Sequence, residues 1–269
     1  MPKNILYPVD FSARSHAVWP AVAAMARQLG ASVTVLHVLD LPEEFGEADD
    51  LCARAAQKLR LFPAARCEVV VGSPAQQIVR FAEGMESPLI MIPTQGRTRF
   101  RELLLGSVAA SVLHDADCPV WTDVHSATAV AHGKDYRSLL CAVDMGPQTA
   151  SVLRTAARYA AKFGALLRVV HSVPAVDPRF PSALAERSHA FLLNQARERF
   201  PAVCQQAGVD LPLEIVEEIG VVEGVTAAAA RHDADLLVIG RGVCQGALGR
   251  LRSNAHALIR QSPCAVLSV

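Results

Sequence analysis

The amino-acid sequence predicts an α/β protein with two tandem open parallel sheets of five strands each and helices on both faces of each sheet. Short apolar runs such as residues 89–92 alternate along the chain with longer helical patterns. Because these runs lack polar alternation, they are typical of strands buried on both faces of a parallel sheet. The whole order of elements occurs twice, with matching residues 134 positions apart. The matched residues are Asp10, Gly30 and His37 in the first copy and Asp144, Gly164 and His171 in the second.

The first copy alternates strand and helix throughout. We expect strands at 4–9, 32–39, 67–71, 89–92 and 118–121, and helices at 12–29, 49–61, 74–83 and from 107 onward. Ser12 is a suitable N-cap for the first helix and Gly30 a suitable residue just after its end. Pro20 lies inside that helix and predicts either a kink or a later start near Ser15.

The second copy repeats this order with a longer helix at about 182–207 and a last strand at 265–269. Each copy has about 130 residues, which is a usual size for a domain. We therefore expect one domain over residues 1–124 and another over residues 136–269. The small and polar segment 125–135 has no sustained period and is expected to be a linker.

Composition and charge exclude several classes of protein. Hydrophobic residues make up 51% and charged residues 19% of the 269 residues, and 26 basic residues balance 26 acidic ones. This balance gives no general attraction to nucleic acids or anionic membranes. No apolar run approaches the roughly 18 to 20 residues of a membrane span, and Asp10 interrupts the N-terminus too early for a secretory signal. The seven cysteines form no CxxC pair, so we expect a cytoplasmic protein without a zinc site, a disulfide framework, or a nucleic-acid or membrane partner.

The stretch from 88 to 120 carries the strongest functional pattern. A buried strand leads into a polar loop with Gly96, and Gly106 and Ser107 then begin a helix. Loop amides and a helix N-terminus together favour an anionic ligand. The alternative is that Gly96 serves a turn and Ser107 only caps its helix. Arginines of the loop are available to neutralise phosphate: Arg97, Arg99 and Arg101.

Asp10 and Asp144 follow the first strand of each copy, at the end where open parallel sheets bind ligands. Either carboxylate can contact a ligand there, or it can cap the helix that follows. We leave both interpretations open for Asp10 and favour capping for Asp144. His37 and His171 recur at strand ends and are interpreted as structural imidazoles.

The spacing of the glycines resembles the nucleotide-binding branch of the universal stress protein family, whose pattern is Gly, two residues, Gly, nine residues, then Gly with Ser or Thr. Gly96 and Gly106-Ser107 match this pattern, while Pro93 stands where the first glycine belongs. The resemblance implies a Rossmann-like fold of the adenine-nucleotide alpha hydrolase type. It also implies an ATP site in the first domain, formed by Pro8, Asp10, Val38, Pro93, Gly96, Gly106, Ser107 and Val108. The second domain fits less well, and its candidate residues are Asp144, Gly240, Ser253 and Asn254.

The resemblance implies a stress-response module that binds ATP and acts through conformation or partner binding. The sequence has no P-loop, GxSxG or HExxH motif, so no catalytic residue or metal ligand is proposed. Two alternatives stay open: an interaction or scaffold protein without nucleotide, and a slow ATP hydrolase or self-phosphorylating protein with Ser107 as acceptor.

Domains of this family usually pair through their last strands. The resemblance therefore implies an intramolecular pseudo-dimer, with the strands around Val120 and Val266 antiparallel. An unidentified protein partner and a further homodimer of the two-domain chain are compatible with it.

Overall fold

The computed structural model describes residues 1–41, 48–63, 65–94, 105–123, 135–177, 179, 182–241 and 253–269. These residues divide into two compact units, one before and one after the boundary between Asp135 and Tyr136. Within them no helix is both long enough and apolar enough to span a bilayer.

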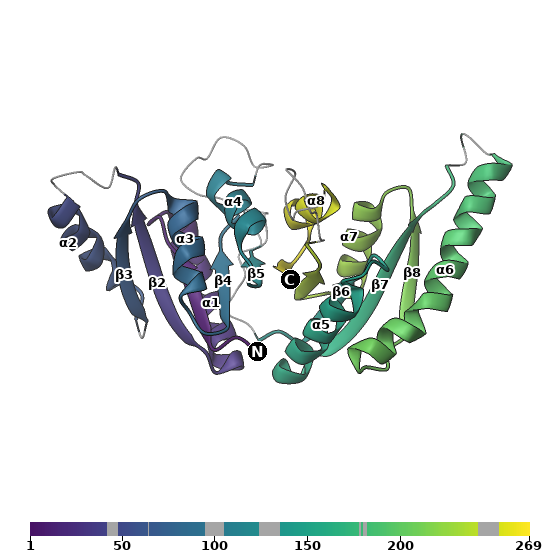
Figure 1. The fold of residues 1–269 in the computed structure, drawn as a ribbon, viewed down its shortest axis with the longest axis horizontal. Coiled ribbons are helices and arrows are strands. Elements are labelled where there is room, and N and C mark those ends of the chain that lie inside the picture. The colour runs from purple at the N-terminus through teal and green to yellow at the C-terminus, as the bar shows by residue number, and fades with distance from the viewer. Residues whose placement is uncertain are drawn as a thin grey trace. The chain divides into compact units, whose positions relative to one another are not determined.

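Unit 1 is an open sheet of five parallel strands in the order β3-β2-β1-β4-β5 (Figure 1). The strands are β1 (Asn4–Pro8), β2 (Ser32–Leu39), β3 (Arg66–Val71), β4 (Pro88–Ile92) and β5 (Val120–Thr122). The helices are α1 (Ala13–Leu29), α2 (Ala48–Leu59), α3 (Pro74–Glu83) and α4 (Ser107–Asp115). The order reverses direction between β1 and β4, and such a reversal opens a crevice at the carboxyl ends of the strands.

Unit 2 repeats this arrangement, with parallel strands in the order β8-β7-β6-β9-β10. Its strands are β6 (Ser138–Ala142), β7 (Leu166–Pro174), β8 (Leu213–Glu218), β9 (Leu236–Ile239) and β10 (Ala265–Ser268). Its helices are α5 (Thr149–Phe163), α6 (Ala183–Ala207), α7 (Val221–Arg231) and α8 (Ser253–Gln261). The expected fold of two tandem five-stranded parallel α/β sheets is confirmed.

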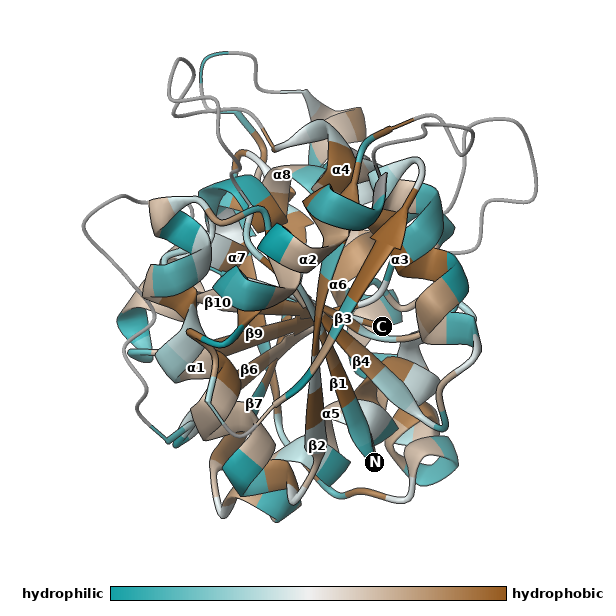
Figure 2. Ribbon diagram, turned by 90° about the vertical axis from the view of Figure 1, so that its left-hand side faces the viewer, coloured by the Kyte–Doolittle hydropathy of each residue, from teal (hydrophilic) through white to brown (hydrophobic). Residues whose placement is uncertain are grey.

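Both faces of each sheet are covered, because right-handed crossovers place helices on opposite faces when the strand order reverses. In unit 1, α1 and α2 connect strands that progress toward the β3 edge of the sheet, and α3 and α4 connect strands that progress toward the β5 edge. The two pairs of helices therefore lie on opposite faces, and α3 packs against α4. The strands are hydrophobic along most of their length (Figure 2). Trp121 and Tyr7 are fully buried in the core.

Helix α1 begins at Ala13, capped by the Ser12 side chain, which accepts a hydrogen bond from the Ser15 amide. It ends at Gly30, whose φ of 68° lies in the left-handed region that glycine adopts readily. The expectation of a later start near Ser15 is wrong. Pro20 is exposed, so the His16 carbonyl that loses its helical donor can bind water instead.

Some expectations fall outside the described residues. These are the loop residues Gly96, Arg97, Arg99 and Arg101, and nearly all of the linker. The pairing of the two domains as a pseudo-dimer stays a prediction.

Candidate functional site

A cavity of about 710 Å³ lies at the carboxyl ends of β1, β2 and β4 in unit 1, where the strand order reverses. This volume is within the range of pockets that bind small molecules. All described members of the candidate set for the first domain line it, and only Gly96 is outside the described residues. The lining members are Pro8, Asp10, Val38, Pro93, Gly106, Ser107 and Val108.

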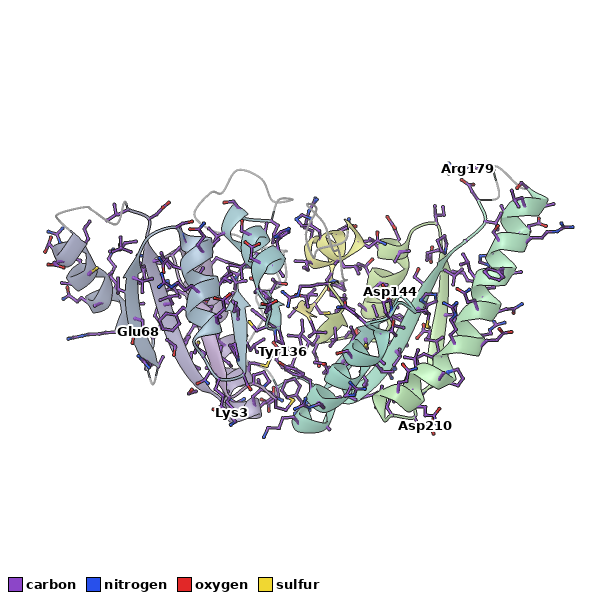
Figure 3. The ribbon with its side chains drawn as sticks, in the orientation of Figure 1. Lys3, Glu68, Tyr136, Asp144, Arg179 and Asp210 are labelled. Atoms are coloured by element: carbon purple, nitrogen blue, oxygen red, sulfur yellow. The ribbon has the colours of Figure 1, made fainter. Side chains whose placement is uncertain are left out.

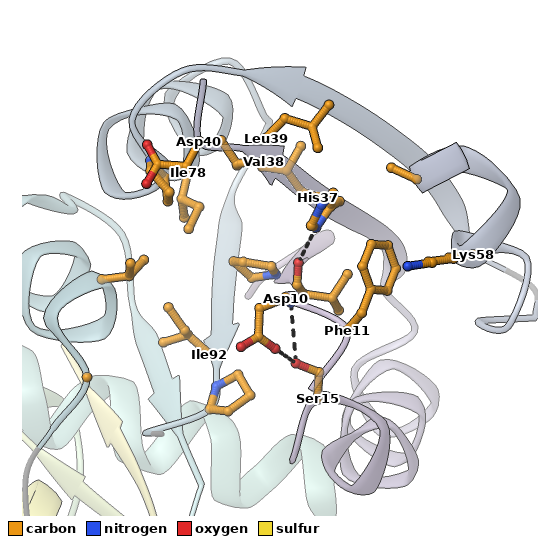
Figure 4. A pocket seen from close by; sticks show the side chains of 18 of the residues that line it. Asp10, Phe11, Ser15, His37, Val38, Leu39, Asp40, Lys58, Ile78 and Ile92 are labelled. Carbon is orange, nitrogen blue, oxygen red and sulfur yellow. Dashed lines mark hydrogen bonds between the residues drawn. The ribbon is translucent and has the colours of Figure 1, made fainter. Parts of the chain in front are cut away.

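Asp10 is held by the chain that follows it. Its Oδ1 accepts hydrogen bonds from the Ser12 amide at 3.0 Å and from the Ser15 hydroxyl at 2.5 Å, the latter drawn in Figure 4. Burial by itself raises the pKa of Asp10, but the hydrogen bonds from Ser12 and Ser15 outweigh it and hold the pKa below its ordinary value. Asp10 is therefore an ionised hydrogen-bond acceptor at neutral pH. It caps the start of α1, as one of the two interpretations requires, and it also lines the cavity.

Phe11, His37 and Lys58 form one wall of the cavity (Figure 4). The rings of Phe11 and His37 lie 4.3 Å apart, and the Lys58 ammonium lies 5.5 Å from the centre of the Phe11 ring. His37 Nδ1 lies 2.7 Å from the Val9 carbonyl oxygen. Since a carbonyl only accepts, Nδ1 carries the proton. This is the structural role expected for His37.

The start of α4 forms the opposite wall. The Gly106 amide donates to the Thr94 carbonyl oxygen at 2.9 Å, so it is already used within the protein. The first hydrogen bond inside α4 runs from the Ala110 amide to the Gly106 carbonyl. The amides of Ser107, Val108 and Ala109 consequently have no acceptor within the helix, and all three residues line the cavity.

Glycine is not required at position 106 by backbone conformation. Its φ is −59°, a value that other residues adopt freely. The remaining reason is room for a ligand close to the backbone. Pro93 is buried and lines the cavity without filling it.

Unit 2 has a related but smaller cavity of about 230 Å³. It contains Asp144 (labelled in Figure 3), Gly240 and Asn254 of the candidate set. The side chain of Ser253 is outside the described residues. Asp144 Oδ1 accepts from the Gly146 amide at 2.9 Å and the Thr149 hydroxyl at 3.1 Å. These bonds hold the turn before α5, whose N-cap is Gln148 and has no side-chain capping bond, so the capping interpretation of Asp144 stays a prediction.

The sequence reasoning missed three residues next to the site, which are Arg14, Thr94 and Asp123. Asp123 is fully buried after β5, and it binds Thr94 after β4 and Arg14 in the first turn of α1. The available signal was a carboxylate placed directly after a buried strand of a parallel sheet, which is also the signal that identified Asp10.

Comparison with known proteins agrees with this fold. The model of the universal stress protein family matches residues 1–123 and again residues 135–269. The chain belongs to the universal stress protein family. The two matches make it a tandem member with two universal stress protein domains.

Individual universal stress proteins are similar to one part of the chain or to most of it. Universal stress protein MJ0531 of Methanocaldococcus jannaschii is 31% identical over 137 residues, which cover 44% of this chain and 79% of that protein. Universal stress protein Rv2005c of Mycobacterium tuberculosis is 26% identical over 231 residues, covering 74% of this chain and 77% of its own. A universal stress protein of Archaeoglobus fulgidus has the same fold over 100% of this chain and 98% of its own, with 20% identity and a TM-score of 0.69.

Proposed function

We propose that the first domain binds a nucleotide, ATP, and that the protein serves a stress response through ligand-dependent conformation or partner binding. The observation that carries the proposal is the 710 Å³ cavity at the reversal point of the sheet. It brings residues from three strand ends together with the start of α4.

The two ends of the cavity suit different parts of a nucleotide. Asp10 is an ionised acceptor that can take hydrogen bonds from a base or ribose. The amides of Ser107, Val108 and Ala109 stand at the positive end of the α4 dipole, which favours phosphate. The hydroxyl of Ser107 adds a further donor at that end.

The direct test begins with the bound ligand. Heating the freshly purified chain and identifying the released molecule by mass spectrometry should recover an adenine nucleotide. Titration calorimetry with ATP should then give binding that Gly106→Val abolishes, because the new side chain occupies the space left for a phosphate. Gly84→Val is the matched control, since an added Cβ there meets only the Phe81 carbonyl oxygen at 3.6 Å. Failure of both the released ligand and the titration would refute the proposal.

A second function, that of an interaction protein without nucleotide, is favoured by the Gly106 amide being occupied by Thr94 and by Pro93 having no amide. It predicts an empty purified protein and no change of partner binding on Gly106→Val. Hydrolysis or self-phosphorylation is tested by incubation with labelled ATP. Labelled Ser107 or free phosphate would support it, and the absence of both would exclude it.

A further inference from the structure

Asp123 lies behind the cavity in unit 1 and has no exposed surface. Its Oδ1 accepts from the Thr94 amide at 2.8 Å and the Thr94 hydroxyl at 3.0 Å. Its Oδ2 accepts from Arg14 Nε at 2.5 Å, and Arg14 Nη2 lies at the same distance. None of these three residues is among those that line the cavity. Both carboxylate oxygens are therefore used inside the protein.

The contacts of Asp123 lead to both ends of the cavity. Thr94 directly follows Pro93, which lines the cavity, and the Thr94 carbonyl accepts the Gly106 amide. Thr94 thus joins the end of β4 to the residue that precedes α4. Arg14 is followed by Ser15, whose hydroxyl donates to Asp10. The Asp123 carboxylate therefore binds Thr94, which accepts from Gly106 at one end of the cavity, and Arg14, which precedes the Ser15 that donates to Asp10 at the other end.

The second domain has no carboxylate side chain at the corresponding position. In unit 2 the residues that correspond to Thr94 and Asp123 are Arg241 and Val269, and the Arg241 amide donates to the Val269 carbonyl oxygen at 3.0 Å. Gln148 corresponds to Arg14. A backbone hydrogen bond therefore joins the ends of the two strands at the place where unit 1 uses the Asp123 carboxylate.

Burying an ion pair costs free energy, and replacing both partners by neutral residues of similar shape often leaves the free energy of unfolding unchanged. Burial raises the pKa of Asp123, and Arg14 and Thr94 lower it only in part. An ion pair that is held at two fixed points is suited to positioning. The domain with the ion pair is also the one with the larger cavity.

We propose that Asp123, oriented by Arg14, is a positioning residue for the phosphate end of the site: through Thr94 it fixes Gly106 and the amides at the start of α4. This inference rests on the proposed nucleotide binding. It predicts that the pair matters for the phosphates and little for adenosine. A residue that only stabilised the fold would affect both ligands alike.

The test uses the full chain and two ligands, ATP and adenosine, each measured by displacement of a fluorescent ATP analogue. Asp123→Asn and Arg14→Gln should each weaken ATP at least about tenfold, the loss of one charge-assisted hydrogen bond, and should leave adenosine within about twofold. Arg14→Lys keeps the charge and should recover part of the ATP affinity. Asp115→Asn is the matched control, because Asp115 is on the exposed side of α4 and pairs with the exposed His114.

Each outcome decides between the two proposals. Equal losses for ATP and adenosine, or no loss of ATP affinity, would overturn the positioning role while nucleotide binding stands. A wild-type chain that binds neither ligand would refute nucleotide binding itself and this inference with it. If Asp123→Asn does not fold, Arg14→Gln and Thr94→Val decide, since Thr94→Val removes only the hydroxyl bond to Asp123. The same selective loss of ATP is then required of both.

Discussion

Replacing Ser15 by alanine tests the geometry around Asp10 without touching any candidate residue. Ser15 is 2% exposed, and its hydroxyl donates to the Asp10 carboxylate at 2.5 Å. A hydrogen bond to a charged group contributes about 1.5–3 kcal/mol. Asp10 keeps the Ser12 amide and faces a cavity that admits water, so we expect the low end, a loss of about 1.5 kcal/mol in the free energy of unfolding.

The assay can follow this domain alone. The two tryptophans of the sequence, Trp19 and Trp121, both belong to unit 1. Urea unfolding monitored by tryptophan fluorescence therefore reports on the domain that contains the substitution. Ser73→Ala is the matched control: Ser73 precedes α3 but makes no side-chain capping bond, so its effect should stay within about 0.5 kcal/mol.

The pH dependence separates this hydrogen bond from a general packing loss. Once Asp10 is protonated, the Ser15 hydroxyl no longer binds a charged acceptor, and the difference between Ser15→Ala and wild type should shrink to roughly 0.5–1 kcal/mol. The explanation fails if Ser15→Ala destabilises no more than Ser73→Ala at pH 7. It fails equally if the loss stays the same when the pH is brought below the pKa of the folded Asp10, which lies under its ordinary 3.8.

Three further substitutions test separate features. Because the pKa of Asp10 is lower in the folded chain than its ordinary 3.8, ionised Asp10 stabilises the fold above about pH 4. The stability difference between wild type and Asp10→Asn should thus fall on acidification, and a pH-independent difference would contradict it. Gly30→Ala should cost about 1 kcal/mol from its φ of 68° alone, against almost nothing for Gly84→Ala. Gly224→Ala should lower the free energy of unfolding, followed by circular dichroism, by about 1–2 kcal/mol, since its Cβ would lie 2.6 Å from Ser172 Oγ. If Ser172→Ala does not reduce this loss, the clash is not the cause.

Features that depend on neighbouring residues were readable from the sequence. Ser12 and Gly30 bound α1 as expected, and Pro74 begins α3. Capping and left-handed turns are decided by a few consecutive side chains, so the sequence carries them directly. The duplication also showed which strands of the two domains correspond.

Features that depend on distant residues were not readable. Asp123 meets Thr94 and Arg14 only because β5, β4 and α1 are adjacent in the fold, since the partners are 29 and 109 positions apart in the sequence. No short spacing marks such a contact. The hydrogen bond from the Gly106 amide to the Thr94 carbonyl could not be predicted for the same reason. A sequence motif shows that a glycine is present, but it does not show which acceptor the glycine amide binds.

The duplication limits what the residues shared by both domains can explain. Asp10 and Asp144 have the same local hydrogen bonds, and His37 and His171 each lie 2.7 Å from the carbonyl of the residue before that aspartate. Yet one cavity has about 710 Å³ and the other about 230 Å³. Because this arrangement occurs in both the large and the small cavity, it is a feature of the fold at the end of the first strand. Selectivity for a ligand has to come from residues that differ between the two domains. Val38 against Ser172 is the sharpest such difference. Among the described residues the Ser172 hydroxyl, which is buried in the smaller cavity, has no hydrogen-bond partner. Ser172→Val should therefore stabilise unit 2 while leaving ATP binding unchanged.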